Sequence, residues 1–194
     1  LGQSHMEQAH VQWWRDQAYY DAPGRCTYAR DGGGVLLTQA IHTLDLMGHL
    51  TGAVTSVQAM MGTTGLHAME AEDMAVSGLR FADGALGMVT ATTAAFPGRT
   101  EEIALHGSLG SARLGPAVAT LALHDGHTET LGEGDAGSGG GADPMAFSFA
   151  WHQAIMEDFA QALADGRRPA VPGRAALEVH RLIDAMSHSA RRGA

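Results

Sequence analysis

A run of six short β-type segments, which follow one another with no helical pattern between them, constrains this chain most. They span residues 54–61, 74–81, 85–94, 102–106, 111–114 and 118–124. Asp83-Gly84 lies between the second and third segments and favours a two-residue hairpin turn. Strands joined by such short turns pair antiparallel, so the sequence predicts a largely antiparallel sheet.

Strand and helix patterns on either side of this region complete the predicted fold. Residues 3–14 alternate as a first strand does, and residues 35–50 carry apolar side chains at helical spacing. Two closing helices are expected over residues 146–165 and 174–191. Strands that arrive consecutively between helices predict the α+β class. We expect a single domain over residues 1–194, built as a two-layer, largely antiparallel open β-sheet with helices on one face.

The first closing helix carries a regular apolar stripe. Every fourth residue along it is large and apolar, which predicts packing against the core. The stripe consists of Phe147, Trp151, Ile155, Phe159 and Leu163. The opposite face of the sheet has no segment of this chain left to cover it, so a second subunit or a further domain is expected there.

Composition excludes several functions. The net charge is −9 and all 12 basic residues are arginine, so the chain offers no lysine for a P-loop or a Schiff base and no clustered positive charge for nucleic acid. No apolar run approaches the ~20 residues of a membrane span, so no membrane contact is expected. Cys26 is the only cysteine, which excludes an internal disulfide and predicts a cytoplasmic location.

Residues 132–137 match the dinucleotide fingerprint G-x-G-x-x-G by spacing. The fingerprint binds a pyrophosphate where a strand leads directly into a helix, because the helix amides then face the phosphates. Here the glycines belong to a glycine-rich stretch, 132–142, that predicts a flexible loop, and Glu133 and Asp135 stand where a phosphate would bind. We therefore expect no nucleotide site on this chain.

The helix predicted over residues 35–50 carries polar side chains along one stripe. They are Thr38, His42, Asp45 and His49, three or four residues apart, with Gln39 beside them. In a cleft, an imidazole there would exchange a proton with a bound hydroxyl. On a solvated face, the same side chains would bond only to each other and to water. A metal site is not expected, because two histidines seven residues apart do not chelate one ion unaided.

A second group of residues combines arginine with aromatic rings. It consists of Trp13, Trp14, Arg15, Tyr19, Tyr20 and Arg25. Guanidinium groups bind carboxylates through paired hydrogen bonds, and tyrosines add flat area and a hydroxyl, so the group suits an anionic or polyhydroxyl ligand. The same residue types dominate subunit interfaces, and both interpretations stay open.

Residues 31–34 (DGGG), followed by residues 39–45 (QAIHTLD), resemble the C-terminal domain of the glucose–fructose oxidoreductase / inositol dehydrogenase (Gfo/Idh/MocA) family. The order of parts agrees over nearly the whole chain: an aromatic–arginine loop, a helix, a long antiparallel region and two closing helices. The Trp-Trp-Arg opening and residues 36–46 (LLTQAIHTLDL) most resemble the phthalate dihydrodiol dehydrogenase-like branch.

This resemblance implies a two-domain protein. Members bind NAD or NADP in an N-terminal Rossmann domain that also carries a lysine; that domain is absent from this chain, which would bind no cofactor alone. His42 matches the family's acid/base histidine. Thr38 stands where many members have an aspartate, so a carboxylate partner for His42 is in doubt. Gln39 would orient the substrate, and Asp45 would have a supporting or structural role.

The resulting hypothesis concerns the intact protein. It would be a nicotinamide-dependent dehydrogenase that acts on a secondary alcohol of a sugar-like or cyclic diol substrate, with this chain as its substrate-binding and dimerisation domain. Arg15, Tyr20 and Arg25 would contact that substrate or a neighbouring subunit, and the open sheet face would form a homodimer or higher homo-oligomer. The alternatives are a non-catalytic ligand-binding or assembly module and a free-standing ligand-binding domain.

Overall fold

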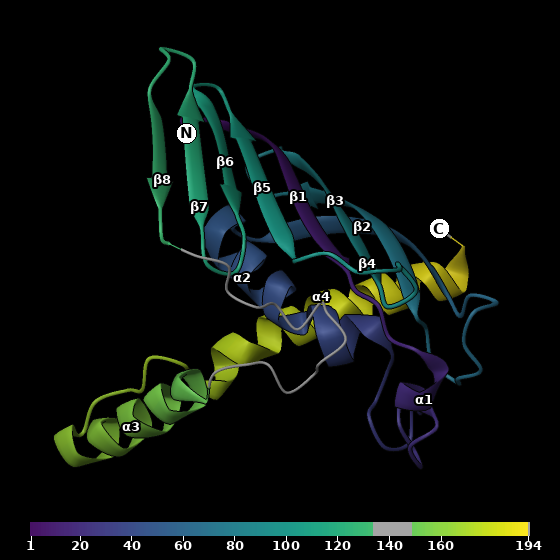
Figure 1. The fold of residues 1–194 in the computed structure, drawn as a ribbon. Coiled ribbons are helices and arrows are strands. Elements are labelled where there is room, and N and C mark those ends of the chain that lie inside the picture. The colour runs from purple at the N-terminus through teal and green to yellow at the C-terminus, as the bar shows by residue number, and fades with distance from the viewer. Residues whose placement is uncertain (134–148, 194) are drawn as a thin grey trace.

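One eight-stranded sheet dominates the computed structural model, which describes residues 1–133 and 149–193 (Figure 1). Its strands are β1 (Ser4–Gln12), β2 (Val54–Gly62), β3 (Met74–Phe81), β4 (Leu86–Thr92), β5 (Glu102–Gly107), β6 (Gly110–Leu114), β7 (Ala119–Leu123) and β8 (Thr128–Leu131). Their order is β2-β3-β4-β1-β5-β6-β7-β8. β1 runs parallel to β4 and the other neighbouring pairs are antiparallel, which confirms the predicted sheet.

The predicted strands agree with the observed ones to within a few residues. Residues 74–81 form β3 as predicted, and the hairpin at Asp83-Gly84 joins it to β4. Alternation in the first strand is confirmed as well, because Glu7, Ala9 and Val11 are all buried. β8 has no counterpart in the prediction, since its four residues are all exposed and show no buried alternation.

Helices cover one face of the sheet (Figure 1). The segment predicted as one helix over residues 35–50 forms a π-helical turn, η1 (Leu36–Ala40), that continues into α2 (Ile41–Thr51). α4 (Gly173–Arg192) contacts α2 and packs on β2, while α2 also contacts β1 and β5. α1 (Gln17–Tyr20) is a single turn after β1. The α+β class and the layered arrangement are therefore confirmed.

The core lies between the sheet and these two helices. Leu44 and Met47 of α2 and Met186 of α4 are at most 1% exposed. They form one cluster with Val11 and Val89 from the central strands β1 and β4. Burying each such side chain contributes roughly 1.5–3 kcal/mol, so α2 and α4 are the helices that stabilise the sheet.

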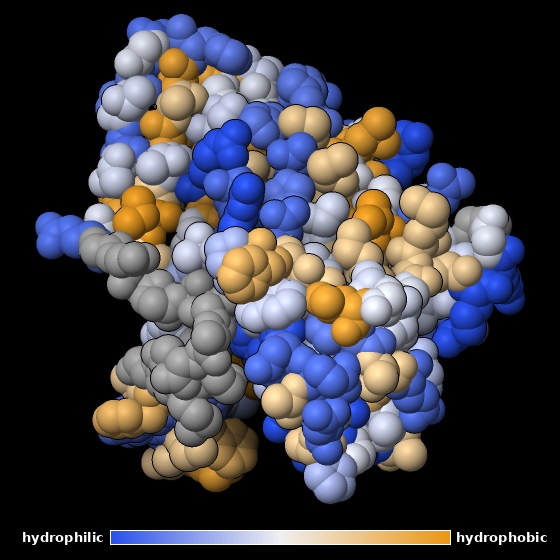
Figure 2. All heavy atoms as spheres, turned by 45° about the vertical axis from the view of Figure 1, so that its right-hand side comes forward, coloured by the Kyte–Doolittle hydropathy of each residue, from blue (hydrophilic) through white to orange (hydrophobic). Residues whose placement is uncertain are grey.

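The other face of the sheet carries exposed apolar side chains. Met6 and Leu86 are register partners on β1 and β4 and are 41% and 51% exposed, and Met60 on β2 is 73% exposed. Figure 2 shows apolar side chains mixed with polar ones over the surface that it presents. No described segment of the chain lies over these three residues.

The packing predicted for the first closing helix is wrong. This helix is α3 (Ala150–Asp165), and Figure 1 shows it extending away from the sheet. Four side chains of its stripe are 53–69% exposed, namely Trp151, Ile155, Phe159 and Leu163; Phe147 lies outside the described residues. The helical spacing identifies the apolar side of α3, and the described residues leave more than half of each of these four side chains exposed.

Two further predictions concern residues outside the described ranges. Most of the glycine-rich stretch at 132–142 and the first residues of the helix predicted over 146–165 lie there, together with most of the dinucleotide-like spacing. Within the described ranges, the helices are too short or too polar to cross a bilayer.

Candidate functional site

A buried glutamate fixes the start of η1. Glu72 accepts hydrogen bonds from the backbone N–H groups of Gly34 (3.1 Å) and Leu36 (3.3 Å) through its two carboxylate oxygens, and its carbonyl oxygen accepts one from Val35 (2.8 Å). Burial raises the pKa of the Glu72 carboxyl, and these hydrogen bonds oppose that rise. Glycine is required at position 34, because a Cβ atom there would lie 1.9 Å from the Glu72 carbonyl oxygen.

The same contact bears on cofactor binding. A glycine-rich turn that opens a helix binds phosphate through its free N–H groups, and residues 32–34 have that form. Here the N–H groups of Gly34 and Leu36 already donate to Glu72, and the carboxylate would repel a phosphate. Within the described residues, this turn does not fit the pyrophosphate of a dinucleotide.

Polar side chains gather on η1 and the first turn of α2. The Thr38 hydroxyl donates to the carbonyl oxygen of Gly34 (2.7 Å) and also contacts Oε1 of Gln39. Gln39 is 4% exposed, and its Nε2 donates to the hydroxyl of Tyr19 (3.4 Å). His42 is exposed and makes no hydrogen bond or ion pair with the described residues. The imidazole of His42 therefore has no described partner, and it lies two residues after a π-helical turn, a feature that recurs at functional sites.

Two arginines lie over the ring of Tyr19. The guanidinium carbon of Arg25 is 4.2 Å from the ring centroid, and that of Arg15 is 5.4 Å from it. Arg15 also lies 5.3 Å from the ring of Trp13. Tyr19 therefore connects both arginines to Gln39. It is absent from the predicted ligand contacts, because nothing in the sequence distinguishes it from its neighbour Tyr20.

Tyr20 is buried, and its placement does not support the predicted role as a substrate contact. It is 6% exposed, and its hydroxyl hydrogen-bonds with that of Thr93. Burial raises the pKa of this phenol. Its ring packs against His67 with the ring centroids 4.7 Å apart. Tyr20 therefore packs in the interior against Thr93 and His67.

His67 and Asp73 form a buried pair that supports Arg15. Nδ1 of His67 lies 2.6 Å from Oδ2 of Asp73, and Nε2 lies 2.9 Å from the carbonyl oxygen of Arg15. A carboxylate and a carbonyl therefore hold the two ring nitrogens of His67 and fix the orientation of the ring. Thr64 donates two further hydrogen bonds of 2.7 Å to Asp73. The spacing of these residues in the sequence carries no signal for this pair.

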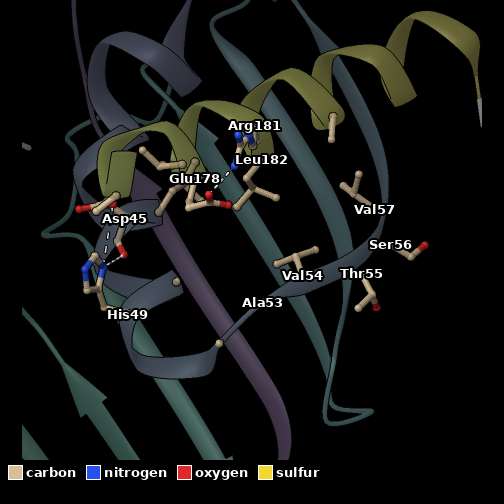
Figure 3. A pocket seen from close by; sticks show the side chains of 16 residues that line it. Asp45, His49, Ala53, Val54, Thr55, Ser56, Val57, Glu178, Arg181 and Leu182 are labelled. Carbon is tan, nitrogen blue, oxygen red and sulfur yellow. Dashed lines mark hydrogen bonds and ion pairs between the residues drawn. The ribbon is translucent and has the colours of Figure 1, made fainter. Parts of the chain in front are cut away.

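Asp45 and His49 line a separate groove (Figure 3). This groove, of about 580 Å³, lies between the end of α2, the start of β2 and the first half of α4. His49 Nδ1 donates to the carbonyl oxygen of Asp45 (2.9 Å) and lies 3.9 Å from its carboxylate. The predicted polar stripe therefore divides. Thr38 contacts Gln39, and Gln39 contacts Tyr19, whereas no described contact joins Asp45 to His42.

The described residues hold no cluster of three or more His, Cys, Asp or Glu side chains that would suit a metal ion. Cys26 is buried, and burial raises the pKa of its thiol, which disfavours the thiolate that a nucleophile requires.

The protein is thus an α+β domain with an exposed imidazole, His42, three residues after Gln39, which contacts the arginine–tyrosine cluster. The family model described as the GFO/IDH/MocA C-terminal domain matches residues 1–113. The chain belongs to this family.

Solved structures agree with the family. The WlbA dehydrogenase from Bordetella pertussis, in complex with NADH and UDP-GlcNAcA, is 28% identical with a TM-score of 0.77, over 100% of this chain and 54% of that one. The WlbA dehydrogenase from Chromobacterium violaceum, in complex with the same two compounds, is 30% identical with a TM-score of 0.78. The match covers 99% of this chain and 54% of that one. A levoglucosan dehydrogenase in complex with NADH and L-sorbose shows the same fold, with a TM-score of 0.80. It is 22% identical over 98% of this chain and 57% of that one. No curated protein sequence matches this chain.

This chain spans about half the length of these relatives. The resemblance to the Gfo/Idh/MocA C-terminal domain is therefore confirmed at the level of the family, and the neighbours are dehydrogenases in complex with NADH.

Proposed function

We propose that this chain is the substrate-binding half of an NAD-dependent oxidoreductase that acts on a secondary alcohol of a sugar-like or cyclic diol compound. The observation that carries the proposal is the free imidazole of His42, one helical turn beyond Gln39 and its contact with Tyr19. The WlbA structures, 28% and 30% identical to this chain, contain NADH and UDP-GlcNAcA, which supports a sugar-type substrate. A cyclic diol, as in the phthalate dihydrodiol dehydrogenase-like branch, is the other substrate that the sequence motifs favour.

In this mechanism His42 accepts the hydroxyl proton as the alcohol becomes a carbonyl, and returns it in the reverse direction. A bound nicotinamide would accept, as a hydride, the hydrogen of the carbon that bears the hydroxyl. Gln39, held by Thr38 and Tyr19, would orient the substrate. Thr38 is uncharged and uses its hydroxyl on Gly34 and Gln39, so it does not act as an ionised partner for His42.

The remaining part of the protein would supply the nucleotide site and would cover α3. The relatives are nearly twice as long as this chain and contain NADH, whereas the glycine turn of this chain is closed by Glu72. The exposed stripe that includes Trp151 and Phe159 is apolar surface of the kind that packs against another domain.

The outer face of the sheet is proposed to contact a second copy of the protein. A two-fold contact uses the same patch on both subunits, and Met6, Met60 and Leu86 are exposed on this face. Light scattering of the intact protein at tens of micromolar should give twice the monomer mass. A monomer at that concentration would contradict the homodimer.

Replacement of His42 tests the proposed function. In the intact protein, His42→Ala should lower kcat for NADH formation by roughly 10²–10⁴-fold, the usual contribution of a positioned acid/base. His49→Ala is the matched control, because His49 lies on the same helix but contacts Asp45 in the separate groove. Turnover that is unchanged in His42→Ala, or equally reduced in both variants, would overturn the assignment.

A non-catalytic ligand-binding or assembly module is the second candidate. It is favoured by the absence, among the described residues, of any carboxylate in contact with His42. An intact protein that binds sugars but forms no NADH with any secondary alcohol offered would support this alternative over the dehydrogenase.

A further inference from the structure

We propose that the substrate carries a carboxylate and that Arg25 binds it. This inference rests on the proposed function, because Arg25 and Gln39 both contact Tyr19 and Gln39 is three residues before His42. It makes the substrate a sugar-type acid instead of a neutral sugar, and it makes Arg25 the residue that distinguishes the two.

Arg25 is an incompletely compensated cation. Its Nε atom is buried and has no hydrogen-bond partner among the described residues. No described carboxylate lies within ion-pair distance, 4.0 Å, of its guanidinium group. Arginine stays charged at any working pH, and a partly desolvated charge is costly unless an opposite charge neutralises it. An anion brought by the ligand would provide that charge.

The acidic side chains of the same loop have other partners. Asp16 accepts from the backbone N–H of Tyr19 (3.1 Å), and Asp21 accepts from the side chain of Gln17 (2.9 Å). Asp31 accepts from the backbone N–H of Cys26 (2.7 Å) and lies 3.5 Å from Nε of Arg30. Each of these carboxylates therefore bonds to other groups of the loop, and none of them forms an ion pair with Arg25.

The position of Arg25 also suits recognition of a planar anion. Its guanidinium group lies 4.2 Å from the centroid of the Tyr19 ring, and such stacking restricts the orientation of the group. The two terminal nitrogens of a guanidinium match the two oxygens of a carboxylate, with paired, charge-assisted hydrogen bonds. A stacked arginine is therefore a specific site for a carboxylate.

A chain of contacts connects this cation to the proposed proton-transfer group. Arg25 lies over Tyr19, the Tyr19 hydroxyl accepts from Gln39 (3.4 Å), and Gln39 is three residues before His42. A compound of sugar size would present its hydroxyl to His42 and its carboxylate to Arg25. Trp13 and Arg15 border the same cluster.

The test compares acids with their neutral counterparts in the intact protein. Two matched pairs serve as probes: UDP-N-acetylglucosaminuronic acid with UDP-N-acetylglucosamine, and D-glucuronate with D-glucose. NADH formation gives kcat/KM for each compound. The wild type should prefer the acid of a pair, and Arg25→Gln should lower kcat/KM for the acid by about 10- to 100-fold more than for the neutral compound, mainly through KM. Arg25→Lys should recover part of the preference for the acid, since lysine keeps the positive charge but lacks the paired N–H donors of the guanidinium.

Arg30→Gln is the control, because it removes the same charge from an exposed arginine of the same loop; the acid preference should survive it. Two results would overturn the inference and leave the proposed function standing. One is an equal kcat/KM of the wild type for the acid and its neutral counterpart, and the other is an equal fall of kcat/KM for both compounds in Arg25→Gln. Failure of both acids to bind the NAD-loaded protein by calorimetry would overturn it too. Turnover of a neutral alcohol that depends on His42 would then still support the dehydrogenase.

Discussion

α2 and α3 both carry large apolar side chains at helical spacing, yet only α2 buries them. Leu44 and Met47 of α2 are at most 1% exposed, because the sheet lies against them, whereas Trp151 and Leu163 of α3 are 56% and 69% exposed. Helical periodicity therefore identifies which side of a helix needs a partner, and it does not say whether that partner belongs to the same chain.

The largest expected contrast between the two helices comes from one substitution made in each. Leu44→Ala should destabilise this chain by about 2–5 kcal/mol, because it leaves a cavity in the core. Leu163→Ala should change stability by less than about 0.5 kcal/mol, because the side chain is exposed. Urea unfolding of both variants measures the difference. Equal losses would mean that α3 is packed as firmly as α2.

A smaller effect is expected where α2 is anchored. Gly34→Ala should cost about 1–3 kcal/mol, because its new Cβ atom would lie 1.9 Å from the Glu72 carbonyl oxygen. Gly33→Ala is the matched control, since its Cβ atom would meet Leu37 at an ordinary 3.4 Å. The same unfolding experiment separates them, and two equal values would contradict the role of Glu72.

The smallest contrast concerns pH. Burial raises the pKa of Glu72 above its ordinary 4.5, so the folded state binds the proton more tightly. The stability that this shift contributes is full below pH 4.5 and is lost as pH rises through the folded pKa.

Asp158, on α3, shows the opposite behaviour. A hydrogen bond from the backbone of Ala170 and then one from Arg167 lower the pKa of its carboxyl below 3.8, so the stability that Asp158 contributes is lost as pH falls through the folded pKa. Urea unfolding between pH 3 and 7 gives the free energy of unfolding as a function of pH. Glu72→Gln should reduce its dependence on pH above 4.5, and Asp158→Asn should reduce its dependence on pH below 3.8. The opposite pattern would contradict these assignments.

Most of the sheet is predictable from the sequence because turn residues and alternation coincide. The Asp83-Gly84 hairpin fixes the start of β4, while β8 escapes prediction because none of its four side chains is buried. The site is only partly predictable. Helical spacing brings out His42 and Gln39, but Tyr19 joins them through contacts with Arg25 and Gln39, which depend on how the loop folds back on η1. Sequence spacing carries no information about such contacts.

Hydrogen exchange of α2 and α3, measured in this chain and in the intact protein, shows whether a second domain covers α3. We expect the α2 amides to exchange at the same rate in both, because this chain alone buries Leu44 and Met47. The α3 amides should exchange at least tenfold more slowly in the intact protein, where a nucleotide-binding half would cover Trp151 and Phe159. Equal exchange of α3 in the two proteins would contradict the claim that this chain is one half of a two-domain dehydrogenase.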